Sequence, residues 1–263
     1  MDVQAYLRRI RYPRPLTPGT DRPTTDRPTI GLLRSLHRAH LLTVPFENFD
    51  ISLGRKIICD EARFLDKIVN QHRGGFCYEL NGAFAALLRA LGFRVTLLSA
   101  RVASEDGTRG PEFDHLALRV DLEEPWLADV GFGECFLEPL RLDSRTDQPQ
   151  RGRMYRVVAL PSEAGGLGVE ALAEGKWKRQ YTFTLHPREL SEFAGMCHYH
   201  QTSPESHFTR QQICSLATPE GRITLSDEKL IETHAGSRRE RLLAGDKEWR
   251  ATLRERFGVV LPA

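Results

Sequence analysis

The spacing of apolar residues changes near residue 93 of this 263-residue chain. Up to about residue 92 they recur three or four positions apart, which is the spacing of one buried helix face. From Phe93 onward they alternate with polar residues in short runs, separated by Gly, Pro and acidic residues, as in β-strands. This order predicts an α+β fold in which the strands form a small barrel or a strongly curved sheet.

Local signals predict where the elements lie. Thr29 is a suitable N-cap for a helix that carries Leu32, Leu33 and Leu36, and Gly92 is a suitable stop for a helix over residues 78–91. The other predicted helices are residues 63–71, the connector 187–193 and Asp246–Phe257, which Gly258 ends. The predicted strands are residues 93–101, 114–122, 126–130, 154–160 and 177–185, followed by a hairpin of 213–217 and 222–225.

A chain of 263 residues suits two or three small layers better than one core. We therefore expect three parts. Residues 1–92 form a helical domain, residues 93–190 form a β-barrel domain, and residues 191–263 form a connector helix with a mixed domain of helix and strands.

Charge and cysteine content narrow the class of protein. The formal net charge is +2, and acids interrupt the arginine-rich stretch 238–241, so we expect no nucleic-acid partner. No apolar run approaches the ~20 residues of a membrane span, and the N-terminus lacks the features of a signal peptide. Five cysteines without regular spacing argue against a disulfide framework. We expect a cytoplasmic protein that is a monomer or a homodimer.

Cys77 lies where a glycine turn meets a helix. Gly74 and Gly75 precede it closely, and the helical pattern of residues 78–91 starts at it. The unpaired N–H groups and the positive dipole end of a helix N-terminus favour thiolate over thiol, and a thiolate attacks acyl groups. Cys77 is therefore a candidate nucleophile. The alternative is a buried structural cysteine.

Two downstream segments could complete such a site. His115 lies near the start of the strand 114–122, and Asp129 lies among apolar residues of the strand 126–130. The turn 123–125, Glu-Glu-Pro, indicates a hairpin, so these strands are expected to pair antiparallel. The carboxylate could then orient the imidazole, which could deprotonate the cysteine. Taken singly, His115 could be an ordinary strand histidine and Asp129 a turn cap.

Several motifs in order along the chain resemble those of the arylamine N-acetyltransferase family, and the resemblance extends over nearly the whole chain. The motifs are Val44-Pro45-Phe46-Glu47-Asn48, Arg73-Gly74-Gly75-Phe76-Cys77, Asp114-His115-Leu116, Asp129-Val130-Gly131-Phe132-Gly133, residues 199–209, 214–216 and 221–225. Two features depart from the family pattern. The pentad Thr-Asp-Arg-Pro-Thr is doubled at 20–29, in a local insertion that overlaps the segment Pro13–Pro28, and Cys197 stands where an asparagine is expected.

The resemblance implies a helical bundle, a central antiparallel β-barrel and a C-terminal α/β lid around a catalytic core like that of cysteine proteases and transglutaminases. By similarity, Cys77, His115 and Asp129 match the family's Cys-His-Asp triad. The implied reaction moves acetyl from acetyl-CoA, through an acetyl-cysteine, to an arylamine, an arylhydrazine or an N-hydroxyarylamine, with ping-pong kinetics. This is chemistry of xenobiotic metabolism. A thiolate–imidazolium pair at neutral pH is predicted.

Other residues of these motifs have candidate roles around the site. Phe46 and Phe132 could form an aromatic wall for the acceptor, although both could equally be core residues. Arg73 and Glu47 form the obvious internal ion pair, and structural support is the favoured role for both.

Four positions are candidates for contact with coenzyme A. Gly131 and Gly133 would let a pantetheine arm approach the backbone closely, although a turn requirement alone would explain them. The resemblance places Tyr199 and Ser206 near coenzyme A.

The densest group of cysteine and histidine residues could indicate zinc. Its members are Cys197, His198, His200, His207 and Cys214. Cys197 and His200 have the spacing of one ligand pair, but no second pair follows, so we expect no metal.

Three other activities fit parts of the pattern. A cysteine hydrolase or transglutaminase-like enzyme shares the Cys–His–Asp order, but a hydrolase needs water at the acyl-cysteine. An amide synthase that releases polyketide chains joins an aromatic amine to an acyl thioester with a similar triad. A catalytically silent binding domain is disfavoured by the intact Cys77, His115 and Asp129.

Overall fold

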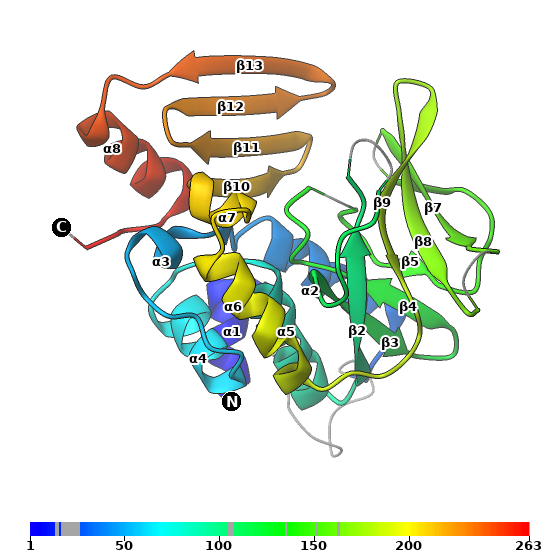
Figure 1. The fold of residues 1–263 in the computed structure, drawn as a ribbon. Coiled ribbons are helices and arrows are strands. Elements are labelled where there is room, and N and C mark those ends of the chain that lie inside the picture. Colours follow the sequence, from blue (N-terminus) through cyan, green and yellow to red (C-terminus); the bar gives the residue numbers. More distant parts are fainter. Residues whose placement is uncertain are drawn as a thin grey trace.

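The computed structural model describes residues 1–13, 16, 27–104, 108–134, 136–150, 152–161 and 164–262. Most of the Pro13–Pro28 segment, where an insertion is predicted, lies outside these ranges. Figure 1 shows a group of helices, a large curved sheet beside it and a smaller sheet above. The α+β fold and the barrel-like sheet predicted from the apolar spacing are confirmed.

Helix α5 (Cys77–Ala90) runs through the helical group and is buried from its first residue almost to its end. The predicted helix 78–91 is confirmed, and Gly92 ends it with a φ of 77°.

The predicted helix cap at Thr29 is also confirmed, because the Thr29 hydroxyl accepts a hydrogen bond from the backbone N–H of Leu32. The other elements of this group are α1 (Val3–Arg9), α2 (Ile30–Leu41), α3 (Phe49–Ser52), α4 (Glu61–Leu65) and the π-helical turn η2 (Asp66–Asn70). Together α4 and η2 account for the helix predicted over 63–71.

The large sheet is antiparallel, with the strand order β5-β4-β3-β2-β9-β8-β7-β6. Its two outermost strands are joined, because the Gln148 side chain bonds the Arg141 backbone N–H at 2.8 Å and its carbonyl at 3.0 Å. The sheet is therefore nearly closed into a barrel. Its strands are β2 (Arg94–Val102), β3 (His115–Asp121), β4 (Pro125–Ala128), β5 (Leu140–Arg141), β6 (Gln148–Gln150), β7 (Arg153–Ala159), β8 (Leu167–Ala173) and β9 (Lys176–Phe183).

The predicted hairpin between β3 and β4 is confirmed. Leu118 lies opposite Ala128, and Asp121 lies opposite Pro125. His115 is the first residue of β3, and Asp129 follows the last residue of β4. The register therefore brings both residues to the same end of the hairpin, against α5.

The smaller sheet joins the helical part of the chain to the C-terminal part. Its edge strand β1 (Phe46–Glu47) comes from the helical part and pairs antiparallel with β10 (Ile213–Thr218). Helix α8 (Asp246–Phe257), which is predicted to the residue, packs beside this sheet through Trp249 and Leu253. The remaining strands are β11 (Gly221–Ser226), β12 (Lys229–His234) and β13 (Ser237–Leu242). Strands β10 and β11 are the hairpin predicted over 213–225.

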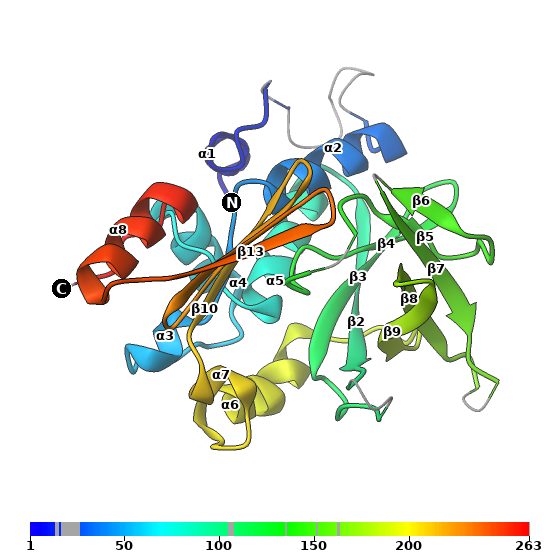
Figure 2. The ribbon, with the colours of Figure 1, turned by 90° about the horizontal axis from the view of Figure 1, so that it is seen from above.

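The connector between the sheets differs from the prediction. Residues 187–189 are extended, because the backbone N–H of Arg188 bonds Leu97 O at 3.0 Å on the edge of β2. The helical part begins later, with the 3-10 turn η3 (Leu190–Phe193), and continues as α6 (Ala194–Thr202) and the short α7 (His207–Arg210). Figure 2 shows α6 and α7 beside the ends of β2 and β3.

Within the described ranges, none of the helices combines the length and the hydropathy that a membrane crossing requires.

Candidate active site

Cys77 is the first residue of α5 and is buried. Gly74 and Gly75 precede it at positions where a side chain would clash with neighbouring atoms. A Cβ on Gly74 would lie 2.0 Å from Pro45 O, and a Cβ on Gly75 would lie 2.7 Å from the Glu79 side chain. These glycines are required for close packing rather than for a left-handed turn.

His115 and Asp129 form a buried pair. The His115 Nε2 atom lies 2.7 Å from Asp129 Oδ2, while Asp129 Oδ1 accepts hydrogen bonds from Asn81 Nδ2 at 2.8 Å and Gly131 N at 3.0 Å. Burial alone would raise the pKa of Asp129, but His115, Asn81 and Gly131 together hold that pKa below its usual value. The carboxylate therefore stays ionised and fixes Nε2 of the imidazole, which leaves Nδ1 for another partner.

Asn81 was not predicted as part of the site, although it lies one helical turn after Cys77. Its Nδ2 group bonds Leu116 O at 2.6 Å as well as Asp129, and its Oδ1 atom accepts from Val130 N at 2.9 Å. Asn81 therefore ties α5 to both strands of the hairpin. The spacing of four residues from Cys77 is the signal in the sequence that could have identified it.

His37 is a second residue that the sequence did not reveal. Its Nε2 atom accepts a hydrogen bond from Asp129 N at 3.0 Å, and its Nδ1 atom bonds Leu137 O at 2.9 Å. Burial lowers the pKa of His37 to about 4, so the ring is neutral and can accept in this way. No local pattern in α2 indicates this contact, because its partners lie about a hundred residues away.

Cys77 and His115 line the same cavity of about 770 Å³. Gly131 packs closely against Cys77, since a Cβ there would lie 2.9 Å from both Cα and O of Cys77. Burial raises the pKa of the Cys77 thiol well above its ordinary value, although hydrogen bonds to the backbone of Leu116 and Tyr78 act in the opposite direction. The predicted thiolate is therefore opposed by burial.

The other predicted residues lie around this cavity. Phe46 and Phe132 form part of its wall, and the Phe132 ring lies 5.2 Å from that of His115. Gly133 has a φ of 86° and faces the Phe46 ring. Tyr199 is 38% exposed at the wall.

Ser206 is 3% exposed, and its hydroxyl caps α7 by accepting from Phe208 N at 3.2 Å.

A second cavity of about 440 Å³ adjoins the first, and the two share the lining residues Phe46, Phe132, His207 and Phe208. Its walls come largely from the smaller sheet. They carry two arginines and one glutamate, Arg222, Arg238 and Glu134.

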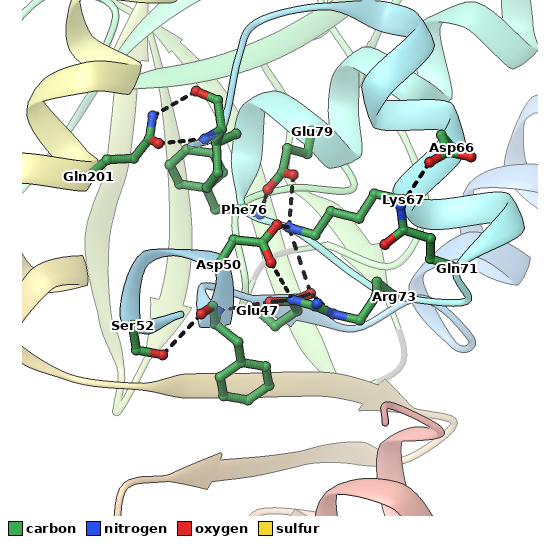
Figure 3. Close-up of polar contacts among 12 residues, drawn as sticks. Glu47, Asp50, Ser52, Asp66, Lys67, Gln71, Arg73, Phe76, Glu79 and Gln201 are labelled. Carbon is green, nitrogen blue, oxygen red and sulfur yellow. Dashed lines mark hydrogen bonds and ion pairs between the residues drawn. The ribbon is translucent and has the colours of Figure 1, made fainter. Parts of the chain in front are cut away.

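Figure 3 shows a buried cluster of charges beside the start of α5. Arg73 bonds Glu47 at 2.8 and 2.9 Å and Asp50 at 3.0 Å. Lys67 bonds Asp50 and Glu79 at 2.8 Å each. The predicted Arg73–Glu47 contact thus belongs to a cluster of three carboxylates and two cations. Removing one member of a buried ion pair typically costs about 3–5 kcal/mol.

Glu79 connects this cluster to the backbone next to Cys77. One carboxylate oxygen accepts from Lys67 Nζ, and the other accepts from Phe76 N at 3.1 Å, one residue before Cys77. Burial, together with the charges of Glu47 and Asp50, raises the pKa of Glu79 to about 7.

A raised pKa in the folded state means that this group stabilises the fold most below its unfolded pKa, and that this contribution is lost as pH rises through about 7. We expect the unfolding free energy to fall by about 1–3 kcal/mol between pH 5 and 8 because of Glu79. Glu79→Gln, which cannot ionise, should flatten that slope. Urea unfolding across this pH range measures it, with Glu61→Gln on the exposed start of α4 as the control. Equal slopes for wild type and Glu79→Gln would contradict the expectation.

Three of the five cysteine and histidine residues in the candidate zinc group have other contacts in the structure. Cys214 lies in β10 within the core of the smaller sheet, and His200 contacts Asp114. Cys197 lies against Ile57 O. The Gln201 side chain, drawn in Figure 3, bonds the Ile57 backbone and holds α6 in place. Among the residues that the structure describes, no three His, Cys, Asp or Glu side chains converge as ligands of a metal ion.

Comparison with known proteins identifies the family. Residues 29–263 match the N-acetyltransferase family model. The chain is 33% identical to the pineal gland arylamine N-acetyltransferase isozyme NAT-3 of Gallus gallus, over 99% of this chain and 95% of that protein. The arylamine N-acetyltransferase of M. tuberculosis superposes with a TM-score of 0.87 at 31% identity, over 98% of this chain and 93% of that one. The M. marinum enzyme in complex with CoA gives 0.86 at 30% identity, over 98% and 92%. The chain therefore belongs to the arylamine N-acetyltransferase family and is an acyltransferase.

Proposed function

We propose that this enzyme transfers acetyl from acetyl-CoA to arylamines, arylhydrazines and N-hydroxyarylamines through an acetyl group on Cys77. One observation carries the proposal. Cys77 opens into the same cavity as the 2.7 Å His115–Asp129 pair, and that cavity is lined with aromatic side chains. The CoA complex of the M. marinum relative supports coenzyme A as the carrier of the acetyl group.

In the first step, Cys77 Sγ attacks the thioester carbonyl, and His115 Nδ1 takes the thiol proton. The carbon–sulfur bond to coenzyme A breaks, and the leaving thiolate recovers that proton from His115. Asp129 keeps Nε2–H of the imidazole pointed at its own carboxylate, so that Nδ1 is the atom that accepts. The imidazolium that forms beside Cys77 opposes the effect of burial on the thiol.

In the second step, the amine nitrogen attacks the acetyl-cysteine carbonyl. The proton that the amine loses passes to His115 and then to the Cys77 sulfur, which regenerates the free thiol. Donor and acceptor thus react in turn with the same sulfur, and the expected signature is ping-pong kinetics. The aromatic wall of Phe46 and Phe132 suits a planar aryl acceptor.

For coenzyme A we propose a path from the second cavity to Cys77. Arg222 and Arg238 give that cavity the positive charge that phosphate groups require. The pantetheine arm would pass the junction of the two cavities, near Gly131 and Gly133. Tyr199 is exposed enough to reach a ligand there.

Ser206, which the resemblance also places near coenzyme A, is buried as the cap of α7. We propose that it acts on coenzyme A binding through the segment that it holds.

The wider setting follows from this chemistry. We propose that residues 1–92 form the domain that supplies Cys77, that residues 93–190 form the domain that supplies His115 and Asp129, and that residues 191–263 cover the site. Because the reaction needs a reduced thiol, we place the enzyme in the cytoplasm. We propose a role in xenobiotic metabolism, as a monomer or homodimer without nucleic-acid partners.

The test is the release of coenzyme A with and without an aryl amine, followed by chromatography. Without amine, we expect about one equivalent of free coenzyme A per enzyme and then almost no further release. Adding an arylamine or arylhydrazine should start continuous turnover and yield the acetylated amine. Release that continues at the same rate without amine would indicate a cysteine hydrolase. Turnover only with acyl thioesters larger than acetyl would indicate an amide synthase.

A further inference from the structure

A second histidine–aspartate pair lines the cavity that contains Cys77. His200 Nε2 of α6 lies 3.2 Å from Asp114 Oδ1, just before β3, and both residues line the cavity. Their side chains are 9% and 15% exposed, so the pair borders the cavity without standing in solvent. Asp114 precedes His115 directly in the chain.

The backbone before β3 is held in an uncommon conformation that positions Asp114. Phe113 has a φ of 65°, which is costly for a residue with a bulky side chain. The Tyr78 hydroxyl donates to Phe113 O at 2.7 Å, and the Ser99 hydroxyl accepts from Phe113 N at 2.8 Å. Asp114 Oδ2 also accepts from Val102 N at 3.3 Å, which leaves Oδ1 toward His200.

His200 is fixed from several sides. Its ring lies 5.2 Å from the Phe208 ring and 6.1 Å from the Tyr78 ring. Its Nδ1 atom lies 3.5 Å from the Ser206 hydroxyl. Tyr78 contacts both members of the pair, because its hydroxyl also donates to Asp114 O at 3.3 Å, and it directly follows Cys77.

The acetyl-transfer steps make no use of this pair. Asp129 already orients His115, and the Asp114 carboxylate is directed at His200 instead. A rigid, polar, partly buried pair in a cavity that is also lined by aromatic side chains is the kind of group that fixes which ligands a pocket accepts.

The charges of the two adjoining cavities point to the ligand. The second cavity carries Arg222 and Arg238 against the single carboxylate of Glu134, and this excess of positive charge suits the phosphates of the acyl donor. The cavity around Cys77 carries the carboxylates of Asp114 and Glu205 instead. A negative wall disfavours anions and favours N–H donors and cations. The acyl acceptor, rather than the nucleotide, is therefore the ligand that meets Asp114.

We propose that the His200–Asp114 pair determines acceptor specificity: it selects acyl acceptors that carry a hydrogen-bond donor or a positive charge beyond the aryl ring, and it disfavours acceptors that carry a carboxylate. The proposal rests on the proposed transfer through Cys77. Asp114 attracts the donor or cation, and His200 holds Asp114 and covers part of its charge.

The test compares two acceptors in reaction with preformed acetyl-enzyme, 4-aminobenzoate (anionic) and 4-aminobenzylamine (cationic at about pH 7.5). For each enzyme, kcat/KM for 4-aminobenzoate is divided by kcat/KM for 4-aminobenzylamine. The ratio of each variant is then compared with that of wild type, so that the intrinsic reactivities of the two amines cancel. In Asp114→Asn we expect the ratio of 4-aminobenzoate to 4-aminobenzylamine to rise by about tenfold, since the lost charge acts in opposite directions on the anion and the cation and each effect is worth about threefold. In His200→Leu, which uncovers the carboxylate, the ratio should fall.

Asp121→Asn is the matched control. Asp121 is the last residue of β3, the strand that Asp114 precedes, and it pairs with Arg119 away from this cavity. Its ratio should stay within about twofold of wild type. A ratio that is unchanged in Asp114→Asn, or that moves the same way in both pair variants, overturns the proposal. If Asp114→Asn does not fold, the direction of change in His200→Leu decides. Failure of the wild type to form acetyl-enzyme would instead overturn the proposed function.

Discussion

Replacing Cys77 by serine is expected to lower kcat/KM for acetyl transfer by at least about 10³-fold. The serine hydroxyl is close in size to the thiol, so it should fit at the first turn of α5 without a cavity. Its oxygen is far harder to deprotonate in a buried site, and the sulfur that carries the acetyl group is gone. Steady-state kinetics with an aryl amine measure the loss.

The stability of Cys77→Ser separates chemistry from folding. We expect the midpoint of urea unfolding to stay close to that of wild type, because Gly74, Gly75 and Gly131 keep their contacts. A correctly folded Cys77→Ser enzyme that retains a tenth or more of wild-type activity would contradict the role of this residue.

Asp129→Asn is expected to lower kcat by about 10³- to 10⁴-fold. The amide cannot hold the imidazole as the carboxylate does, because its NH₂ group can donate to Nε2. The His115 proton then moves to Nδ1, the atom that accepts the thiol proton in the proposed mechanism, and proton transfer is blocked. Asn81 and Gly131, which donate to the same carboxylate, lose a charged acceptor as well.

The pH dependence of thiol alkylation reports this defect directly. Burial raises the pKa of Cys77, so its reaction with iodoacetamide should need a higher pH wherever His115 can no longer accept the proton. We expect Asp129→Asn and His115→Gln to shift the alkylation profile upward relative to wild type, by similar amounts. Asp129→Asn with near-normal kcat and an unshifted profile would contradict the proposed role of Asp129.

Local signals in the sequence were sufficient for the core of the site. Helix α5 has a regular apolar face and a glycine stop, and the β3–β4 hairpin has alternating strands with a clear turn. Cys77, His115 and Asp129 each lie at an end of one of these elements, so predicting the elements also placed the three residues. Motif resemblance added the roles that we propose for them.

Contacts between distant segments could not be predicted in this way. His37 reaches Asp129 from α2, and Lys67 and Asp50 complete the cluster around Arg73 and Glu79 through packing alone. No short-range pattern specifies such partners. The strand β8 was missed for a related reason, since its alanines and Gly168 give a weak alternation and the neighbouring strands determine its pairing.

The pKa of the Cys77 thiol illustrates best what cannot be predicted from the sequence alone. Position at a helix N-terminus predicts a thiolate, and that effect is real but local. Burial of Cys77 acts against it, and burial depends on how Gly131 and the hairpin close over α5. The helix position can be read from the sequence, whereas the degree of burial comes only from the assembled fold.

The most direct measurement is the intact mass of the enzyme after incubation with acetyl-CoA alone, with the modified residue located by peptide mapping. The account predicts a gain of one acetyl group, on the peptide that contains Cys77, which disappears when an aryl amine or hydrazine is added. An unchanged mass under conditions of full turnover, or an acetyl group on another residue that the amine removes, would contradict it.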